Sequence, residues 1–127
     1  MSEFTFKKAE RLSSRKAIAA LFQTGRIQVS TPVRILYRVS GEGVYPASMA
    51  VSIPKRLFRR AVDRNLLKRR IREIYRKNKP LFYDQLNRAG IRLELVIQYQ
   101  KREMVSYGEL ENGLKRGLNN VLSDLTG

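Results

Sequence analysis

Histidine and cysteine are both absent from this chain of 127 residues. Their absence excludes an imidazole general base, a thiol nucleophile, a disulfide and a conventional zinc site. Acidic residues are scarce as well: there are 11, and they are scattered, mostly beside basic residues. Magnesium chemistry carried by a protein alone requires carboxylates that converge on one site. The composition therefore argues against an enzyme that works by itself.

Long apolar runs are also absent, since no stretch approaches the ~20 residues needed to span a bilayer. The first twelve residues, MSEFTFKKAERL, lack the apolar core of a secretion signal. Together with the lack of cysteine, this leads us to expect a cytoplasmic protein without a membrane partner. The length fits one compact domain over residues 1–127, and a hydrophobic content of 43% is enough for a core.

Basic residues dominate what is present. The chain has 26 lysines and arginines and a formal net charge of +15. Such a surface attracts polyanions, so nucleic acid is the first candidate partner and an anionic membrane the competitor. Twelve of the basic residues lie between positions 55 and 79, where only Asp63 and Glu73 oppose them. The charge is thus concentrated in about a fifth of the chain.

Hydrophobic periodicity predicts an α+β fold. The expected elements, in order, are a helix capped by Ser13 or Ser14 and ending near Gly25, strands over residues 31–39 and 47–53, a long helix over 57–78, a further helical turn over 81–88, a strand over 92–99, and a helix that opens on a Ser106–Glu109 capping box. We expect the first two strands to pair as an antiparallel hairpin and Pro80 to close the long helix. The helices should cover one face of a small sheet and leave the other partly open.

The long helix carries its charge on one side. Within an arc of roughly 100° lie Asn65, Lys68, Arg69, Arg72 and Arg76. Another face, suited to packing on the sheet, carries Leu67, Ile71, Ile74 and Tyr75, and Arg64 lies between the two faces. Exposed helix faces usually mix both signs of charge, so this excess favours a nucleic-acid surface over an ordinary solvated face. Guanidinium groups form forked hydrogen bonds to phosphate and also stack on unpaired bases.

The run AVSIPKRLFRRAVDRNLLKRRIREIYR, residues 50–76, resembles the signature of the bacterial ribonuclease P protein subunit. In that family a strand leads into a basic pair, an Ala-x-x-Arg-Asn step, and then Lys-Arg and Arg-Glu on a long helix. These features stand here as Lys55-Arg56, Ala61 to Asn65, Lys68-Arg69 and Arg72-Glu73. The resemblance extends over most of the chain, through Arg11-Leu12, the Phe22-x-x-Gly25 helix end, Tyr37 and Ser106-Tyr107.

The resemblance implies a two-layer α/β sandwich whose long helix lies in a left-handed βαβ crossover, although a right-handed connection is the general expectation. It also implies a function. The protein would be the non-catalytic subunit of an endoribonuclease whose catalytic RNA removes 5′ leaders from precursor tRNA. The protein would aid the binding of substrate and of magnesium, which would be held mainly by RNA.

The resemblance further implies two binding surfaces. The positions that would face the catalytic RNA are Arg64, Asn65, Lys68, Arg69, Arg72 and Arg76. The open sheet face and the first helix would form a cleft for the single-stranded leader, with Phe22 and Tyr37 inside it and Lys55 and Arg56 near its rim. Aromatic platforms flanked by positive charge suit unpaired RNA. The alternative for both aromatic residues is burial in the core.

Three other functions compete with this one. A ribosomal or other structural RNA-binding protein shares the size and charge, but its long basic segments are commonly extended tails. A DNA-binding regulator needs a short recognition helix and usually a dimer interface, and the pattern offers neither clearly, so we expect no DNA partner. A stand-alone ribonuclease is disfavoured by the lack of catalytic side chains.

Overall fold

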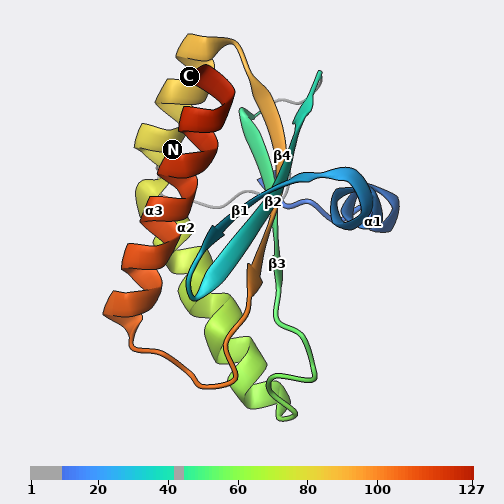
Figure 1. Cartoon of the computed structure of the whole chain (residues 1–127), viewed down its shortest axis with the longest axis vertical. Coiled ribbons are helices and arrows are strands. Elements are labelled where there is room, and N and C mark those ends of the chain that lie inside the picture. The colour runs from blue at the N-terminus through green and yellow to red at the C-terminus, as the bar shows by residue number, and fades with distance from the viewer. Residues whose placement is uncertain (1–9, 42–44) are drawn as a thin grey trace.

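The computed structural model describes residues 10–41 and 45–127, which form three helices and four strands (Figure 1). In chain order these are α1 (Arg15–Thr24), β1 (Arg26–Ser30), β2 (Val33–Ser40), β3 (Ala47–Ser52), α2 (Ala61–Ala89), β4 (Arg92–Tyr99) and α3 (Tyr107–Thr126). Figure 1 shows that the two faces of the sheet are covered unequally, because α2 and α3 lie on one side and α1 lies on the other. The predicted α+β class and its partly open sheet face are confirmed.

The strands form one sheet in the order β1-β2-β4-β3, with β3 parallel to β4 and the other neighbours antiparallel. The predicted hairpin of β2 with β3 is therefore wrong, because β4 lies between them. β4 carries buried side chains on both faces, which suits a central strand: Leu93, Leu95 and Ile97 point one way and Val96 the other. Sequence analysis also missed β1, a short edge strand whose Ile27 and Val29 are exposed.

The connection from β3 through α2 to β4 is the βαβ crossover that the family resemblance implies. Its left-handed sense stays a prediction from that resemblance. The helix within it runs through Pro80 to Ala89 and is capped by Gly90, whose φ of 69° lies in the left-handed region. The predicted end at residue 78 is thus wrong. A proline inside a helix removes one backbone hydrogen bond. Beyond Pro80, however, Phe82 and Leu86 are buried in the main core, and their packing stabilises the continued helix.

The main core lies between the sheet and the pair α2 and α3. Alternate residues of the strands enter it, including Val33, Ile35 and Leu95, and Leu114 of α3 meets them. The helix α3 comes very close to the turn after β1, because a Cβ atom at Gly113 would lie only 2.5 Å from the carbonyl oxygen of Thr31. Only glycine allows this approach, so the packing of α3 depends on it.

The helix α1 covers part of the opposite sheet face. Its N-cap is Ser14, one of the two predicted candidates, whose hydroxyl accepts a hydrogen bond from the amide of Ala17 at 3.2 Å. Leu21 is fully buried against Leu36 and Val96 in a second, smaller apolar cluster. This cluster spans only the middle of the face, so polar side chains remain on either side of α1.

A buried ion pair fastens the segment before α1 to the middle of α2. The Lys79 ammonium lies 3.1 Å from the Glu10 carboxylate, and the Tyr83 hydroxyl donates a hydrogen bond to that carboxylate at 2.5 Å. Burial, together with the neighbouring Tyr75 hydroxyl, raises the pKa of Tyr83, so its hydroxyl stays a donor. Lys79 therefore serves the fold, although it belongs to the basic run in the sequence.

Candidate nucleic-acid interface

The first half of α2 presents the basic residues that sequence analysis assigned to one side. Asn65, Arg69 and Arg72 are exposed, while Lys68 and Arg76 are half-buried. On the opposite side of the helix, Leu67 and Ile71 are fully buried in the main core. The predicted division of this helix into a charged and an apolar face is therefore confirmed.

Arg64 has a more specific local role than the sequence indicated. Its guanidinium donates two hydrogen bonds of 2.8 Å, one to the carbonyl oxygen of Phe58 and one to that of Arg59. These bonds tie the segment before α2 to the first turns of the helix. Arg64 therefore holds the loop in place as well as adding charge.

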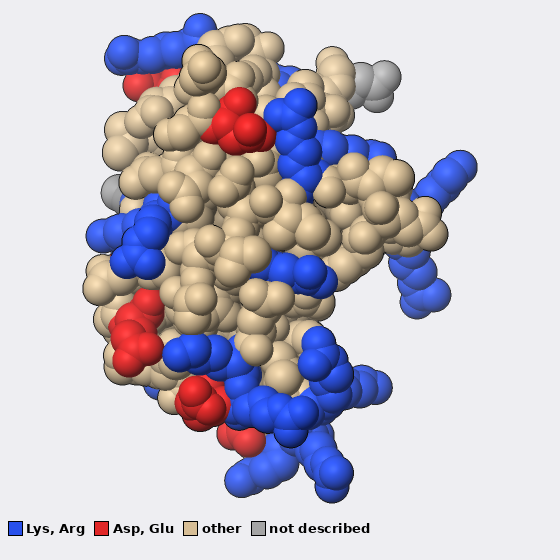
Figure 2. Space-filling view, viewed as in Figure 1, with Lys and Arg blue, Asp and Glu red and all other residues tan. Residues whose placement is uncertain are grey.

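Residues 53–60, which connect β3 to α2, form a basic loop. Lys55, Arg56, Arg59 and Arg60 are all exposed on it. Figure 2 shows lysine and arginine side chains crowded at the lower end of the molecule, where α2 begins in Figure 1. The loop and the first half of α2 thus form one continuous cationic region, which we call the basic end.

The open sheet face carries side chains in three cross-strand rows. The middle row, beneath α1, is apolar and contains Leu36, Val96 and Ala50. On the side toward the basic end, the next row is polar: Arg34 donates from Nε to the Gln98 side-chain oxygen at 2.7 Å, and Gln98 donates to the Ser52 hydroxyl at 3.2 Å. We call this polar row, which lies between α1 and the basic loop, the open strip.

In the row on the other side of α1, the charge of the arginine is neutralised by a carboxylate. Arg38 donates from Nε to the Glu94 carboxylate at 2.7 Å. Arg34 and Arg38 therefore lie on one strand and point to the same face, but Arg38 faces a carboxylate and Arg34 a neutral amide. Sequence analysis singled out none of the residues of the open strip, although strand alternation could have placed Arg34 opposite the apolar face.

The two aromatic residues assigned to the leader cleft lie on different faces. Phe22 is on α1, 40% exposed and outside both apolar clusters, so the alternative of core burial does not apply to it. Tyr37 is 1% exposed and belongs to the main core under α3, so its assignment to the open face is wrong. Alternation showed that Tyr37 shares a face with Val33 and Ile35, but not which face the helices cover.

The Tyr37 hydroxyl has a structural partner instead. It donates a hydrogen bond of 2.6 Å to Asp124 of α3, and Arg26 of β1 reaches the same carboxylate oxygen at 2.9 Å. These two contacts lower the pKa of Asp124, whereas burial and the hydrogen bond to Asp124 raise the pKa of Tyr37. Tyr37 thus links the sheet to the end of α3.

Comparison with known proteins identifies the family. Residues 6–122 match the family model described as Ribonuclease P. The ribonuclease P protein component of Porphyromonas gingivalis strain W83 is 35% identical over 123 residues, which cover 96% of this chain and 90% of that protein. The chain belongs to the ribonuclease P protein family.

Solved structures of this family share the fold. The ribonuclease P protein of Thermotoga maritima superposes with a TM-score of 0.69 at 24% identity, covering 93% of this chain and 99% of the other. A Staphylococcus aureus ribonuclease P protein mutant, described as defective in mRNA degradation, gives a TM-score of 0.72 at 19% identity, covering 90% and 89%. At this identity the likeness supports the fold, in agreement with the family match.

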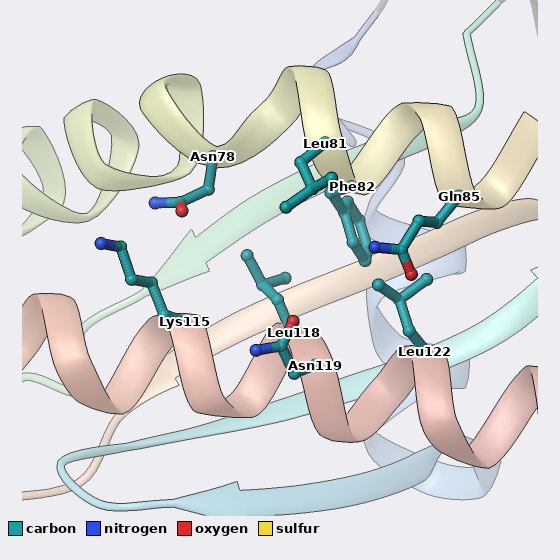
Figure 3. A pocket seen from close by; sticks show the side chains of 8 residues that line it. All are labelled: Asn78, Leu81, Phe82, Gln85, Lys115, Leu118, Asn119 and Leu122. Atoms are coloured by element: carbon teal, nitrogen blue, oxygen red, sulfur yellow. The ribbon is translucent and has the colours of Figure 1, made fainter.

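A second concave feature of this family member lies on the opposite side of the sheet from the open strip. It is a pocket of about 250 Å³ between α2 and α3 (Figure 3). Its lining consists of Asn78, Leu81, Phe82, Gln85, Lys115, Leu118, Asn119 and Leu122. The pocket is therefore bordered by amides, leucines, one phenylalanine and a single cation, in contrast to the charge at the basic end.

The acidic side chains of the described residues do not cluster. In residues 10–41 and 45–127, no three of them lie close enough together to hold a metal ion. Within the same ranges, no helix is long and apolar enough to cross a membrane.

Proposed function

We propose that this chain assists the catalytic RNA of ribonuclease P in two ways, by binding that RNA through the basic end and by holding the 5′ leader of precursor tRNA. Family membership makes the chain a protein component of ribonuclease P, an endoribonuclease that acts in tRNA processing. The proposal adds where each RNA binds and what the protein contributes. A role in the ribosome is not favoured, because the family match covers nearly the whole chain.

The observation that carries the proposal is the unbalanced charge of the basic end. Of its two acids, Glu73 lies 3.6 Å from Lys77, and Asp63 stands in the first turn of α2. The exposed guanidinium groups, such as those of Arg69 and Arg72, lack a comparable acid neighbour among the described ion pairs. Such a surface is suited to binding an RNA backbone, which offers one phosphate for each nucleotide to pair with these cations.

The leader would then lie across the open sheet face beside α1. Phe22 offers an exposed ring on which an unpaired base can stack, and Lys55 and Arg56 offer charges for the leader's phosphates. Mature tRNA has no leader, so contacts at this place favour the substrate over the product. The protein would in this way distinguish precursor from mature tRNA without taking part in bond cleavage.

The chemistry would belong to the RNA. The protein lacks histidine and cysteine, and its described carboxylates do not gather into a metal site. We therefore propose that magnesium is held mainly by the catalytic RNA. The protein's cations would reduce phosphate repulsion between the RNAs and so lower the magnesium concentration needed for cleavage. This activity would be located in the cytoplasm, where tRNA is processed.

Reconstitution tests the proposal. Protein verified to be free of RNA should leave precursor tRNA uncleaved at every magnesium concentration. Together with its cognate catalytic RNA, it should shift the magnesium titration of cleavage to lower concentrations than RNA alone requires. Site-specific cleavage by the protein alone, or a titration that the protein does not shift, would contradict the proposal.

A further inference from the structure

The open strip contains an arginine whose charge is not neutralised. Arg34 is half-buried on β2, an inner strand of the sheet, and it pairs with no carboxylate among residues 10–41 and 45–127. Its neighbour on the same face, Arg38, is neutralised by Glu94 at 2.7 Å. Opposite charges that face each other across two strands stabilise a sheet, as Arg38 and Glu94 do here. The difference at Arg34 therefore suggests that another anion occupies the partner's place.

The hydrogen bonds of the strip determine which atoms of Arg34 can meet that anion. Its Nε is used by the Gln98 side-chain oxygen, and the Gln98 nitrogen is used by Ser52, so the amide cannot rotate without losing both bonds. The two terminal guanidinium nitrogens then remain for a ligand. They donate and cannot accept, and their parallel geometry matches two oxygens of one phosphate.

The surroundings of Arg34 indicate a single-stranded RNA rather than a free anion. The apolar row beneath α1 borders the strip on one side, and the basic loop that follows Ser52 borders it on the other. Figure 2 shows the molecular outline hollowed between α1 and the crowded basic side chains at the lower end. An extended strand lying there would place bases toward Phe22 of α1 and phosphates toward the strip and the loop.

We propose that Arg34 binds a phosphate of the 5′ leader through its terminal nitrogens, and that Gln98 is a positioning residue that orients this guanidinium. The inference rests on the proposed function, since it requires the leader to lie on the open sheet face. It adds a binding residue on an inner strand of the sheet to those on α1 and the basic loop. Ser52 contributes indirectly, because its hydroxyl accepts a hydrogen bond from the Gln98 amide and so fixes the orientation of that amide.

The holoenzyme tests this with precursor tRNAs whose leaders are shortened stepwise to none. Arg34→Ala should weaken binding of tRNA with a long leader by roughly tenfold, and should leave mature tRNA unaffected. The matched control is Arg38→Ala, which removes the same side chain from the same strand and face but from a neutralised position. It should change neither affinity. Melting temperatures of both variants identify any loss of folding.

Variants of Gln98 separate positioning from charge. Gln98→Glu places a carboxylate beside Arg34 and so reproduces the Arg38–Glu94 pair; it should impair leader binding as Arg34→Ala does, with the fold intact. Gln98→Leu leaves the charge but releases Nε, and should give an intermediate loss. Arg34→Lys keeps the charge without the fork and should also be intermediate. A merely structural role of Gln98 would instead make Gln98→Glu harmless to leader binding.

Neutral methylphosphonate linkages, introduced one at a time along the leader, identify the phosphate. In the wild-type holoenzyme one linkage should weaken binding, and in Arg34→Ala the same linkage should have no further effect. If wild-type affinity is independent of the leader, the proposed function itself is wrong. If wild-type affinity depends on the leader while Arg34→Ala behaves like Arg38→Ala, the leader function stands and the role of Arg34 is refuted.

Discussion

On β2, Val33, Ile35 and Tyr37 point toward α2 and α3, whereas Arg34 and Arg38 point to the face that only α1 covers. The first set is buried and meets the core, and even the Tyr37 hydroxyl is satisfied within the protein. The second set is polar and arranged in rows on either side of α1. Because the side chains of a strand alternate between its two faces, one residue of β2 packs in the core while the next lies on the open face. We therefore expect neighbouring substitutions on one strand to affect folding and RNA binding separately.

The largest effect should come from the covered face. Leu95→Ala removes a fully buried side chain between the sheet and the helices, and should lower the free energy of unfolding by about 2–5 kcal/mol. Urea titration of the protein measures this loss. Any loss of apparent affinity follows from the smaller folded fraction, so it should be equal for tRNA with and without a leader. A loss confined to tRNA with a leader would contradict the division between the two faces.

The basic end should show the next largest effect, on binding to the catalytic RNA. Lys68→Ala with Arg72→Ala removes two charges from α2 and should reduce both the affinity and its salt dependence. The slope of log affinity against log salt should fall by up to about one unit for each phosphate that the variant no longer binds. The melting temperature should hold or rise, since like charges are removed.

The control is Lys115→Ala with Arg116→Ala, which removes two exposed charges from α3, where Lys115 lines the pocket of Figure 3. This pair should leave the salt slope almost unchanged. Equal salt slopes for the two double variants would mean that RNA binding depends on the total net charge of the protein and not on the charges of the basic end.

Phe22→Ala should have a smaller effect, limited to the leader. Loss of one stacking platform should weaken binding of precursor tRNA by roughly 1–3 kcal/mol, with mature tRNA bound as before. Because Phe22 is 40% exposed and lies outside both apolar clusters, the melting temperature should change little. A marked fall in melting temperature would instead place its ring in the core.

The smallest expected effect concerns Tyr37 and pH. The lowered pKa of Asp124 means that its carboxylate is better stabilised in the folded state than in the unfolded chain. This contribution is present above the ordinary pKa of 3.8 and is lost as the pH falls through the lower folded-state value.

Tyr37→Phe removes the main cause of the lowered pKa, so the variant should be less stable than wild type at neutral pH and should converge with it in acid. Thermal melting across the acid range measures the two curves. Curves that stay parallel down to the lowest pH would show that the Tyr37 hydroxyl does not act through Asp124. Leader binding should be unaffected at neutral pH.

Much of the local structure could be predicted from the sequence. The Ser14 and Ser106 caps, the bounds of β4 and the two faces of the first half of α2 depend on neighbours within a few residues, so a local pattern is enough. The Ser106 hydroxyl accepts from the amide of Glu109 at 3.2 Å, as the capping motif predicts. The ordered motif from Ala50 to Arg76 likewise indicated the family, because it needs no knowledge of distant contacts.

The site could be predicted only in part. The basic helix face and loop followed from periodicity and charge, but the open strip did not. Gln98 contacts both Arg34 and Ser52 only because β4 lies between β2 and β3, and the predicted hairpin would have placed β3 beside β2 instead. A wrong strand order therefore hides cross-strand partners even when each strand is assigned correctly.

Local patterns were enough to predict which residues share a face, where α1 and α3 begin and which surface is strongly basic. The strand order, the passage of α2 through Pro80 and the burial of Tyr37 under α3 emerged from packing between distant segments. The physical reason is the range of the interactions. Caps and periodicity act within one or two turns of chain, whereas these three outcomes depend on apolar burial between segments far apart in the sequence, which can outweigh a local preference.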